Sequence, residues 1–299
     1  MKKRSNSILK KITYTIEYLL LVAVQVVLSV LHRRAALCLG IGLGELLYLS
    51  GIYRSVALKN MEHTGICCKE SQKALLRKVY RNCGIYAVDF LRKSKTPPPH
   101  RIYQYEETVP VGFEKGKGTI ALLAHFGNWE LLADIFGSSI GKLHVVAKPM
   151  HNTTVESWLY KKRSAAQVKT IYTRNALRNM VKSLKNNCMV AILIDQYGGK
   201  MGTPVPFLGK EANTVRTVAG LVEKTSCSVL TATALIQKDF SYNIHFINVP
   251  TPDTSGLSKQ EAITLIQHKH NDVLSELIET HPEHWFGWFH RRFRGYMNY

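Results

Sequence analysis

Apolar and polar residues follow two different patterns along this chain. In the first part, two long apolar stretches cover residues 12–31 and 35–53, separated by His32, Arg33 and Arg34. From about residue 119 onward, short apolar runs alternate with segments of helical spacing. Strands that alternate with helices indicate a mainly parallel, covered sheet. The pattern therefore predicts an α/β fold with helices on both faces of the sheet, preceded by a membrane-associated helix or helical hairpin.

Strands are expected where an apolar run is four to eight residues long. Such runs lie at residues 119–124, 143–147, 169–172, 189–194 and 228–234, and a more peripheral, alternating strand lies at 242–249. Helical spacing is found at residues 129–136, 153–166, 176–186, 214–224 and 257–279. Pro97, Pro98 and Pro99 mark a loop. We therefore expect an N-terminal membrane anchor at 1–34 and an α/β domain at 35–299, of which 35–100 form a helical membrane-proximal part.

The first apolar stretch is long enough to act as a membrane element. Its 20 residues would extend about 30 Å as a helix, which matches a hydrocarbon core. Glu17 and Gln25 disfavour a clean span, because a central charge costs about 2.5–3.5 kcal/mol on insertion scales. Two interpretations are open: a single span, or a hairpin or interfacial helix that leaves the rest on the cytoplasmic face. The residues before the stretch are basic: Lys2, Lys3, Arg4, Lys10 and Lys11.

The second apolar stretch is rich in small residues, and its composition predicts close helix packing. Gly40, Gly42 and Gly44 recur at every second position. Glycines allow two helix backbones to approach each other closely. A dinucleotide-binding loop is a weaker interpretation, because no strand precedes these glycines.

The composition is informative about the partner mainly through its charge. The 40 Lys and Arg residues outnumber the 21 Asp and Glu residues, which gives a net charge of +19. This excess favours an acidic partner, such as an anionic membrane surface, a phosphorylated substrate, an acidic protein or nucleic acid. The six cysteines form no CxxC pair, and the twelve histidines show no zinc-type spacing. We therefore expect reduced thiols and no metal site.

Polar residues follow three of the predicted strands directly. They are His125, Lys148 and Asp195. In open α/β sheets, active sites gather beyond the carboxyl ends of the strands, so these side chains are the first candidates for chemistry.

The most specific candidate is the HxxxxE motif formed by His125 and Glu130 at a strand-to-helix junction. Gly127 permits a tight turn there, and Asn128 is a preferred N-cap residue. An imidazole can take a proton from an alcohol near neutral pH, and a carboxylate behind the ring can fix its tautomer. We expect His125 to be the base and Glu130 to orient it. A second match, His151 with Glu156, lacks the glycine turn and is interpreted as a chance occurrence on an exposed helix start.

The longer string AHFGNWELL (124–132) resembles the signature of the lipid A biosynthesis acyltransferases, within the wider HxxxxD/E glycerolipid acyltransferase group. Five other segments agree in order, so that the resemblance extends over most of residues 12–294. They are VALKNMEH (56–63), KPMHNTTVESWLYKKR (148–163), YTRNALRNMVKSLKNN with VAILIDQYGG (172–199), VPFLGKEANT (205–214) and HPEHWFGWFHRRFR (281–294). Leu208 departs from the pattern, where a second Phe is common, as do Asn186 and Asn187, which replace a usual Gly.

The resemblance implies an inner-membrane acyltransferase whose active site faces the cytoplasm. It would move a fatty acyl chain from acyl carrier protein, or from acyl-CoA, to a hydroxyl of a lipid A precursor, with no cofactor. Arg163 and Arg174 match family arginines and would bind substrate phosphate or the intermediate. Asp195 would orient an arginine or a substrate hydroxyl, and Asn128 would shape the pocket. The last arginines, Arg291, Arg292 and Arg294, suit lipid head groups or an acidic carrier, or else belong to a packed C-terminal segment.

Two alternatives remain beside this interpretation. A lysophospholipid or another glycolipid could be the acceptor for the same His and Glu pair. A non-catalytic protein that binds anionic lipid or nucleic acid would use the basic surface alone. We expect no nucleic-acid partner, because no nucleic-acid-binding module is present and the apolar N-terminus favours a membrane.

Overall fold

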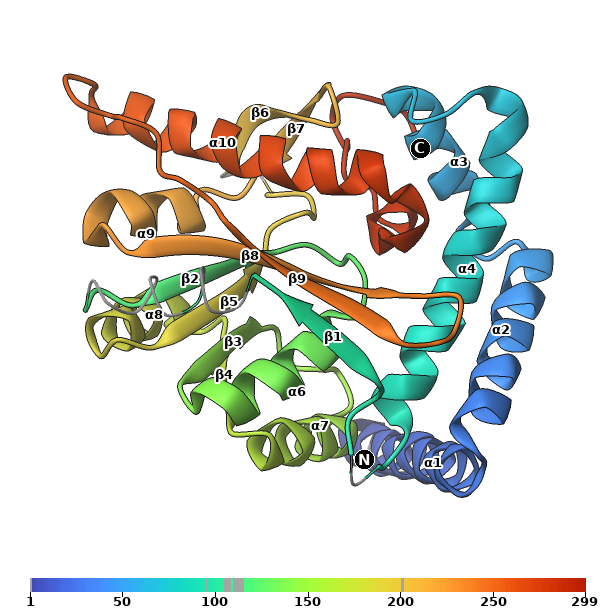
Figure 1. Cartoon of the computed structure of the whole chain (residues 1–299). Coiled ribbons are helices and arrows are strands. Elements are labelled where there is room, and N and C mark those ends of the chain that lie inside the picture. Colours follow the sequence, from blue (N-terminus) through green and yellow to red (C-terminus); the bar gives the residue numbers. More distant parts are fainter. Residues whose placement is uncertain (1, 95, 105–108, 110–115, 200–201) are drawn as a thin grey trace.

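A seven-stranded sheet forms the centre of the computed structural model, which describes residues 2–94, 96–104, 109, 116–199 and 202–299, with side chains from Leu9 onward (Figure 1). The strand order is β1-β9-β8-β2-β5-β3-β4. The strands of this sheet are β1 (His100–Tyr103), β2 (Thr119–Leu123), β3 (Leu143–Ala147), β4 (Val168–Tyr172), β5 (Met189–Leu193), β8 (Ser228–Ile236) and β9 (Tyr242–Asn248).

Most of the sheet is parallel, as the alternation of strands and helices predicts. Strands β8, β2, β5, β3 and β4 run in one direction, whereas β9 runs antiparallel to β8 and β1 runs parallel to β9. Every strand that the sequence pattern predicts is present, with ends that differ by at most a few residues. The prediction of a mainly parallel α/β fold is confirmed.

Three further strands have no counterpart among the expected elements. They are β1 and the antiparallel pair of β6 (Thr203–Phe207) and β7 (Lys210–Thr214). β1 has only four residues, β6 contains two prolines, and β7 is mostly polar. Such segments lack the apolar run that identifies a buried strand, so periodicity alone does not find them.

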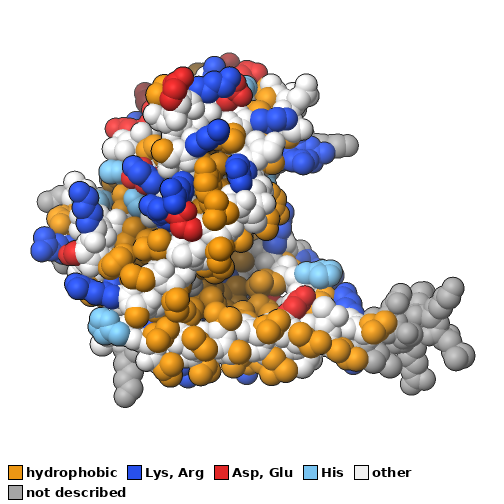
Figure 2. Space-filling view, turned by 90° about the vertical axis from the view of Figure 1, so that its right-hand side faces the viewer, with side chains coloured by type: hydrophobic (Ala, Val, Ile, Leu, Met, Phe, Trp, Pro, Cys, Tyr) orange, Lys and Arg blue, Asp and Glu red, His pale blue; other side chains and the backbone are white. Residues whose placement is uncertain are grey.

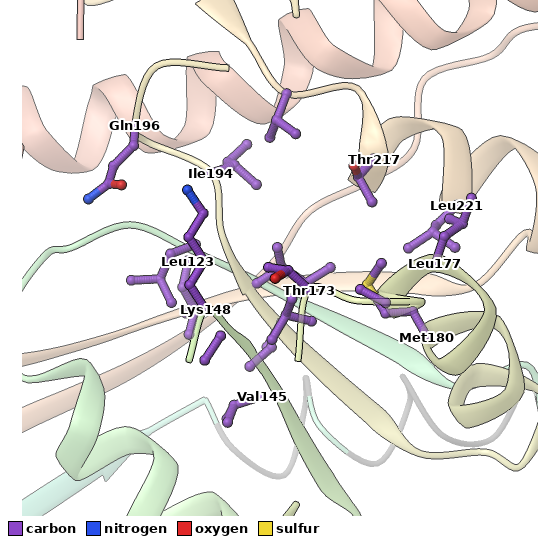
Figure 3. Close-up of a pocket in the computed structure, with 18 of the residues that line it drawn as sticks. Leu123, Val145, Lys148, Thr173, Leu177, Met180, Ile194, Gln196, Thr217 and Leu221 are labelled. Carbon is purple, nitrogen blue, oxygen red and sulfur yellow. The ribbon is translucent and has the colours of Figure 1, made fainter. Parts of the chain in front are cut away.

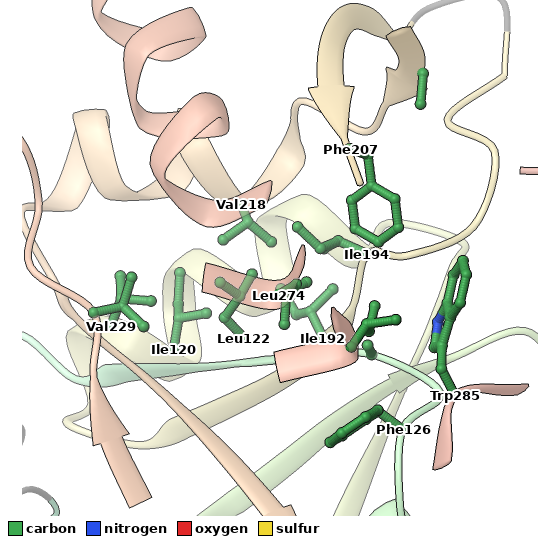
Figure 4. Close-up of a cluster of buried hydrophobic side chains, with 14 of the residues drawn as sticks. Ile120, Leu122, Phe126, Ile192, Ile194, Phe207, Val218, Val229, Leu274 and Trp285 are labelled. Carbon is green, nitrogen blue, oxygen red and sulfur yellow. The ribbon is translucent and has the colours of Figure 1, made fainter. Parts of the chain in front are cut away.

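The helices cover both faces of the sheet. Residues of α8, α9 and α10 pack with Ile120, Leu122 and Ile192 in one core cluster, shown in Figure 4. Residues of α2, α4 and α6 pack with Ala121 and Leu123 in the other cluster. The helices are α1 (Lys2–Val30), α2 (Arg33–Ser50), α3 (Arg54–Thr64), α4 (Lys69–Leu91), α6 (Trp129–Ile140), α7 (Thr153–Ala165), α8 (Ala176–Lys185), α9 (Thr217–Thr225) and α10 (Lys259–Thr280).

The N-terminal helices carry the apolar stretches. Within the described chain, one helical segment, Leu9–Val30, is long and apolar enough to cross a membrane. Helices α2 and α3 pass the same test only if they are taken together, and they are bent by 86°.

All six cysteines are free thiols. Lys2, Lys3 and Arg4 lie outside the residues whose side chains are described.

Two of the three glycines in α2 allow it to pack closely against α4. A Cβ on Gly40 would lie 2.6 Å from the carbonyl oxygen of Gly84, and a Cβ on Gly44 would collide with the carbonyl of Tyr80. A Cβ on Gly42 would meet no atom within 4 Å. The expected close approach is therefore made by Gly40 against Gly84 and by Gly44 against Tyr80, while Gly42 faces away.

These contacts predict different effects for neighbouring substitutions. Gly40→Ala should lower the free energy of unfolding by about 1–3 kcal/mol, because backbone atoms that cannot move aside meet the added methyl group. Gly42→Ala is the matched control and should leave stability unchanged or raise it slightly, because alanine is the better helix former. Thermal unfolding of the detergent-solubilised protein measures both. Equal melting temperatures for the two variants would contradict the packing described.

Candidate active site

The pairing of β2 with β5 brings His125 next to Asp195. The two strands are parallel and paired from Thr119 with Met189 to Leu123 with Leu193. His125 and Asp195 each lie two residues beyond the last pair, on the carboxyl edge of the sheet. Neighbouring parallel strands in register place equivalent positions side by side. The two polar residues therefore meet although 70 positions separate them in the chain.

The contact between them has the geometry of a catalytic imidazole and its carboxylate partner. His125 Nδ1 lies 2.8 Å from Asp195 Oδ1, and the His125 backbone N–H donates to Oδ2 at 3.0 Å. Asp195 is fully buried, whereas the His125 side chain retains 29% of its exposure. A carboxylate at Nδ1 holds the proton on that nitrogen, so that Nε2 is left as the proton acceptor.

The carboxylate that contacts the His125 ring is thus Asp195, and the expectation that Glu130 makes this contact is corrected. Glu130 Oε1 instead accepts from Arg163 at 2.8 Å, in an ion pair that is mostly buried. Glu130 lies in the first turn of α6, where the helix directs it toward α7. Its negative charge still acts on His125, because it is one of the charges that raise the pKa of the imidazole. A catalytic role for Glu130 stays a prediction.

Neighbouring charges raise the pKa of the His125 imidazole. Burial lowers the pKa of the imidazole, but the charge of Asp195, its hydrogen bond and the charge of Glu130 offset this effect and leave the pKa raised. Burial likewise raises the pKa of Asp195, but His125 and the hydrogen bond from Trp285 reverse the shift, so its pKa is lowered. The pair is therefore poised to stabilise an imidazolium when His125 gains a proton.

The C-terminal segment also contacts Asp195. The indole Nε1–H of Trp285, which is fully buried, donates to Asp195 Oδ2 at 2.8 Å. The backbone of the same segment joins the motif, since Phe286 N–H donates to the carbonyl of His125 at 2.8 Å and Gly127 N–H to that of His284 at 2.9 Å. Trp285 is a functional candidate that sequence reasoning missed. Its signal was the aromatic stretch before the last arginines.

Gly127 and Asn128 shape the turn that presents His125. Gly127 has φ +62°, and a Cβ there would lie 2.5 Å from the carbonyl oxygen of Ala234, so both the conformation and the space require glycine. Asn128 caps α6, as predicted, by accepting from Leu131 N–H at 3.0 Å. Its amide also donates to the Tyr242 hydroxyl at 3.1 Å. Asn128 is buried and does not line the cavity described next, which assigns it to the support of the turn.

A large, mostly apolar cavity of about 1180 Å³ opens beside His125 (Figure 3). Lys148 and Gln196 lie on one side of the view, and Leu177, Met180 and Leu221 lie on the other. The wall of the cavity is mostly apolar, with residues of α8 and α9 among its lining, and it also carries polar side chains such as Lys148, Gln196, Lys224 and Lys259. Its volume exceeds the usual range for small-molecule pockets, roughly 300–1,000 Å³.

The cavity reaches both faces of the sheet because two strands separate. β3 is paired with β5 only from Leu143 to Val145, although β3 stays paired with β4 as far as Ala147. Successive residues of a strand point to opposite faces, and both Val145 and Val146 line the cavity. The gap between β3 and β5 therefore connects the space under α6 with the space under α8 and α9.

The other predicted residues divide into two groups. Arg163 lines the cavity, next to Glu130. Arg174 is exposed and does not line it. Arg292 is fully buried and donates to the carbonyl oxygens of Gln196 and Asn213, so this arginine belongs to a packed C-terminal segment rather than to a surface for lipid head groups. His151 is exposed just before α7, as expected of the chance motif.

Among the residues that the structure describes, no three His, Cys, Asp or Glu side chains gather in a way that could hold a metal ion. The candidate site consists of the imidazole and carboxylate pair, the Glu130–Arg163 pair and the cavity. An imidazole supported by a buried carboxylate, beside a large apolar cavity, suits the transfer of an acyl group to a hydroxyl.

The chain matches the bacterial lipid A biosynthesis acyltransferase family over residues 1–295. It therefore belongs to that family and is an acyltransferase of lipid A biosynthesis. A comparison with curated proteins finds no match.

The charges around the imidazole predict an ordered effect of two substitutions on its pKa. Asp195→Asn should lower the pKa of His125 strongly, because it removes both the charge and the hydrogen-bonding carboxylate. Glu130→Gln should lower it less, because Glu130 acts through its charge alone. NMR titration of the His125 ring measures each value. A larger shift in Glu130→Gln than in Asp195→Asn would contradict the geometry.

Proposed function

We propose that this protein transfers a fatty acyl chain from a thioester donor to a hydroxyl of a lipid A precursor, with His125 as the general base. The contact of His125 with buried Asp195 beside the apolar cavity is the observation that carries the proposal. Family membership supports the reaction class and the acceptor.

The proposed reaction proceeds in two steps. His125 Nε2 takes the proton of the acceptor hydroxyl while the oxygen attacks the thioester carbonyl and forms a tetrahedral intermediate. The carbon–sulfur bond then breaks, and the imidazolium returns the proton to the departing thiolate. Asp195 keeps the ring in the required tautomer and stabilises its charged form, because its own pKa is lowered and it stays ionised.

The cations beside the cavity supply sites for negative charge. Lys148 and Arg163 both line it, Lys148 directly after β3 and Arg163 near the end of α7. A guanidinium fork binds phosphate or an oxyanion well, and the hydrogen bond that Arg163 donates to Glu130 fixes its position. We assign these two residues to the phosphate of the acceptor or to the developing oxyanion. Arg174, which is exposed and outside the cavity, is a weaker candidate for the same task.

The donor is proposed to be acyl carrier protein. The net charge of +19 suits an acidic protein partner, which such a surface would attract. Acyl-CoA, which is also anionic, remains the second candidate donor. We place the protein at the bacterial inner membrane with its active site on the cytoplasmic side, because the acyl donors are cytoplasmic.

A matched pair of histidine variants tests the base. His125→Ala should reduce transfer by about 10²–10⁴-fold or more, because it removes the imidazole that Asp195 holds. His151→Ala should retain activity, although it alters the other HxxxxE motif. Mass spectrometry of lipid A from a strain that lacks this gene, complemented with each variant, shows whether one acyl chain is lost. Full activity in His125→Ala would overturn the assignment, and altered phospholipids with unchanged lipid A would favour a lysophospholipid acceptor.

The far end of the cavity is predicted to select the acyl chain. Gly220 of α9 lines it, and a Cβ there would have Ile263 Cδ1 as its nearest neighbour at 4.0 Å, so a larger side chain can be accommodated without a backbone collision. Gly220→Leu should shift transfer toward shorter chains, and Gly220→Ala should shift it less. Competition between acyl donors of different length measures the preference. A uniform loss of rate with no change in preference would place the chain elsewhere.

A further inference from the structure

Helix α1 presents an apolar surface that no other described part of the chain covers. Its exposed side chains are Leu9, Ile12, Ile16, Leu19, Leu20, Val24, Val26, Val27 and Val30. Figure 2 shows apolar side chains in a row along the lower edge of the molecule, where Figure 1 places α1. Contiguous apolar surface of this extent marks a contact with a membrane or a partner.

The opposite side of α1 contacts the body of the protein along most of its length. At one end, Asn152 donates to the carbonyl of Tyr14 at 3.0 Å and to Glu17 Oε2 at 2.7 Å. At the other end, Gln25 donates to the carbonyl of Leu91 at 2.9 Å, and Arg92 donates to the carbonyl of Leu28 at 2.8 Å. These contacts extend over four turns, or about 20 Å of helix.

Such contacts are incompatible with a helix that stands across a bilayer. A span over Leu9–Val30 would place Glu17 and Gln25 in the hydrocarbon, together with the Asn152 amide and the Leu91 carbonyl that bind them. Each polar or charged group buried there carries a large cost. We propose that α1 instead lies flat in one leaflet of an anionic phospholipid bilayer, with its apolar face down, and does not cross the membrane.

The charges at the two ends of α1 fit this partner. Lys10 and Lys11 are exposed near the start of the apolar row, and Arg34 and Lys93 are exposed near its other end. In a spanning helix, the two basic ends would lie on opposite sides of the membrane. In a flat helix, both ends meet the same layer of anionic head groups, which attracts each cation.

Helix α2 extends the same surface in a second direction. Leu39, Leu43, Leu46 and Leu49 are exposed on α2, whose other side packs on α4. Figure 1 shows α1 nearly end-on and α2 from the side, so the two apolar rows cross rather than run together. Two crossed rows define a plane, which fits a lipid surface better than a helical partner. Figure 2 shows a hollow on this same face, directly above the row of α1.

The proposal concerns the anchor and does not depend on the chemistry proposed for His125. It also relates the anchor to the cavity, because α1 contacts the start of α7 and Arg163 near the end of α7 lines the cavity. A flat α1 would hold that side of the protein against the head groups, from which a lipid acceptor could enter sideways.

Spin-label depth measurements distinguish a flat helix from a span. Leu9, Ile16, Leu20 and Val27 lie on one line of the exposed face, by helical spacing. With a nitroxide at each position in turn, in a chain without native cysteines that retains activity, all four should report the same shallow depth in phosphatidylglycerol-containing vesicles. Leu265→Cys on α10, labelled in the same way, is the control and should report water. A label depth that is greatest at Leu20 and small at Leu9 and Val27 would show a spanning helix and overturn the proposal. Labels that lipid-soluble oxygen cannot reach at any of the four positions would overturn it as well, because a second copy of the protein would then cover this face.

A second measurement needs no cysteine replacement. With epitope tags at both ends of the full chain, reconstituted in sealed vesicles, a flat α1 leaves the two tags on the same side of the membrane. Added protease should then remove both tags or neither in each vesicle. Digestion of one tag with protection of the other would show that α1 spans the bilayer.

The charge contribution is tested separately. Lys10→Gln and Arg34→Gln should each weaken binding to anionic vesicles about fivefold, since each cation near the surface contributes a similar amount. Lys185→Gln, an exposed lysine at the end of α8, is the matched control and should bind as the parent protein does. Loss of affinity for only one of Lys10→Gln and Arg34→Gln would contradict a helix with both ends on one leaflet.

Discussion

The contact between His125 and Asp195 is the interaction on which the site depends, and it requires that β2 and β5 are neighbours in register. The buried carboxylate would be costly if it stood alone, and it is stabilised by His125 on one side and Trp285 on the other. Three distant parts of the chain are therefore fixed by one ionised group. A change in any of them alters the pKa of the imidazole as well as the packing.

The sheet opens between β3 and β5, next to the site of His125 and Asp195. β3 leaves β5 beyond Val145, which interrupts the row of backbone hydrogen bonds and leaves room for a cavity that reaches both faces. His125 and Asp195 lie at the edge of this gap. The proton acceptor and the acyl chain of the proposed substrate can therefore occupy the same cavity. Glu130 and Arg163 border the cavity as a second, separate ion pair, which supplies a positioned cation close to the base.

The N-terminal helices extend this arrangement to the membrane. Close contacts through Gly40 and Gly84 hold α2 on α4, and Arg92, directly after α4, binds the end of α1. The apolar faces of α1 and α2 are thus fixed relative to the catalytic domain rather than attached by a flexible linker. In the proposed orientation, the enzyme takes its lipid substrate from the surface on which it rests.

The fold class, the catalytic histidine candidate and the cap at Asn128 could be predicted from the sequence, because strand length, apolar spacing and turn residues are local properties. The sequence also placed Asp195 at a strand end. It could not show that this end lies beside that of β2, so it assigned the carboxylate contact to Glu130, the nearest acid along the chain. The three-dimensional structure was needed to show that Asp195, bound by Trp285, holds the ring, that Glu130 pairs with Arg163 and that Arg292 is buried. Strand order and the docking of the C-terminal segment depend on contacts between residues far apart in the chain, and such contacts leave no periodic signal in the sequence.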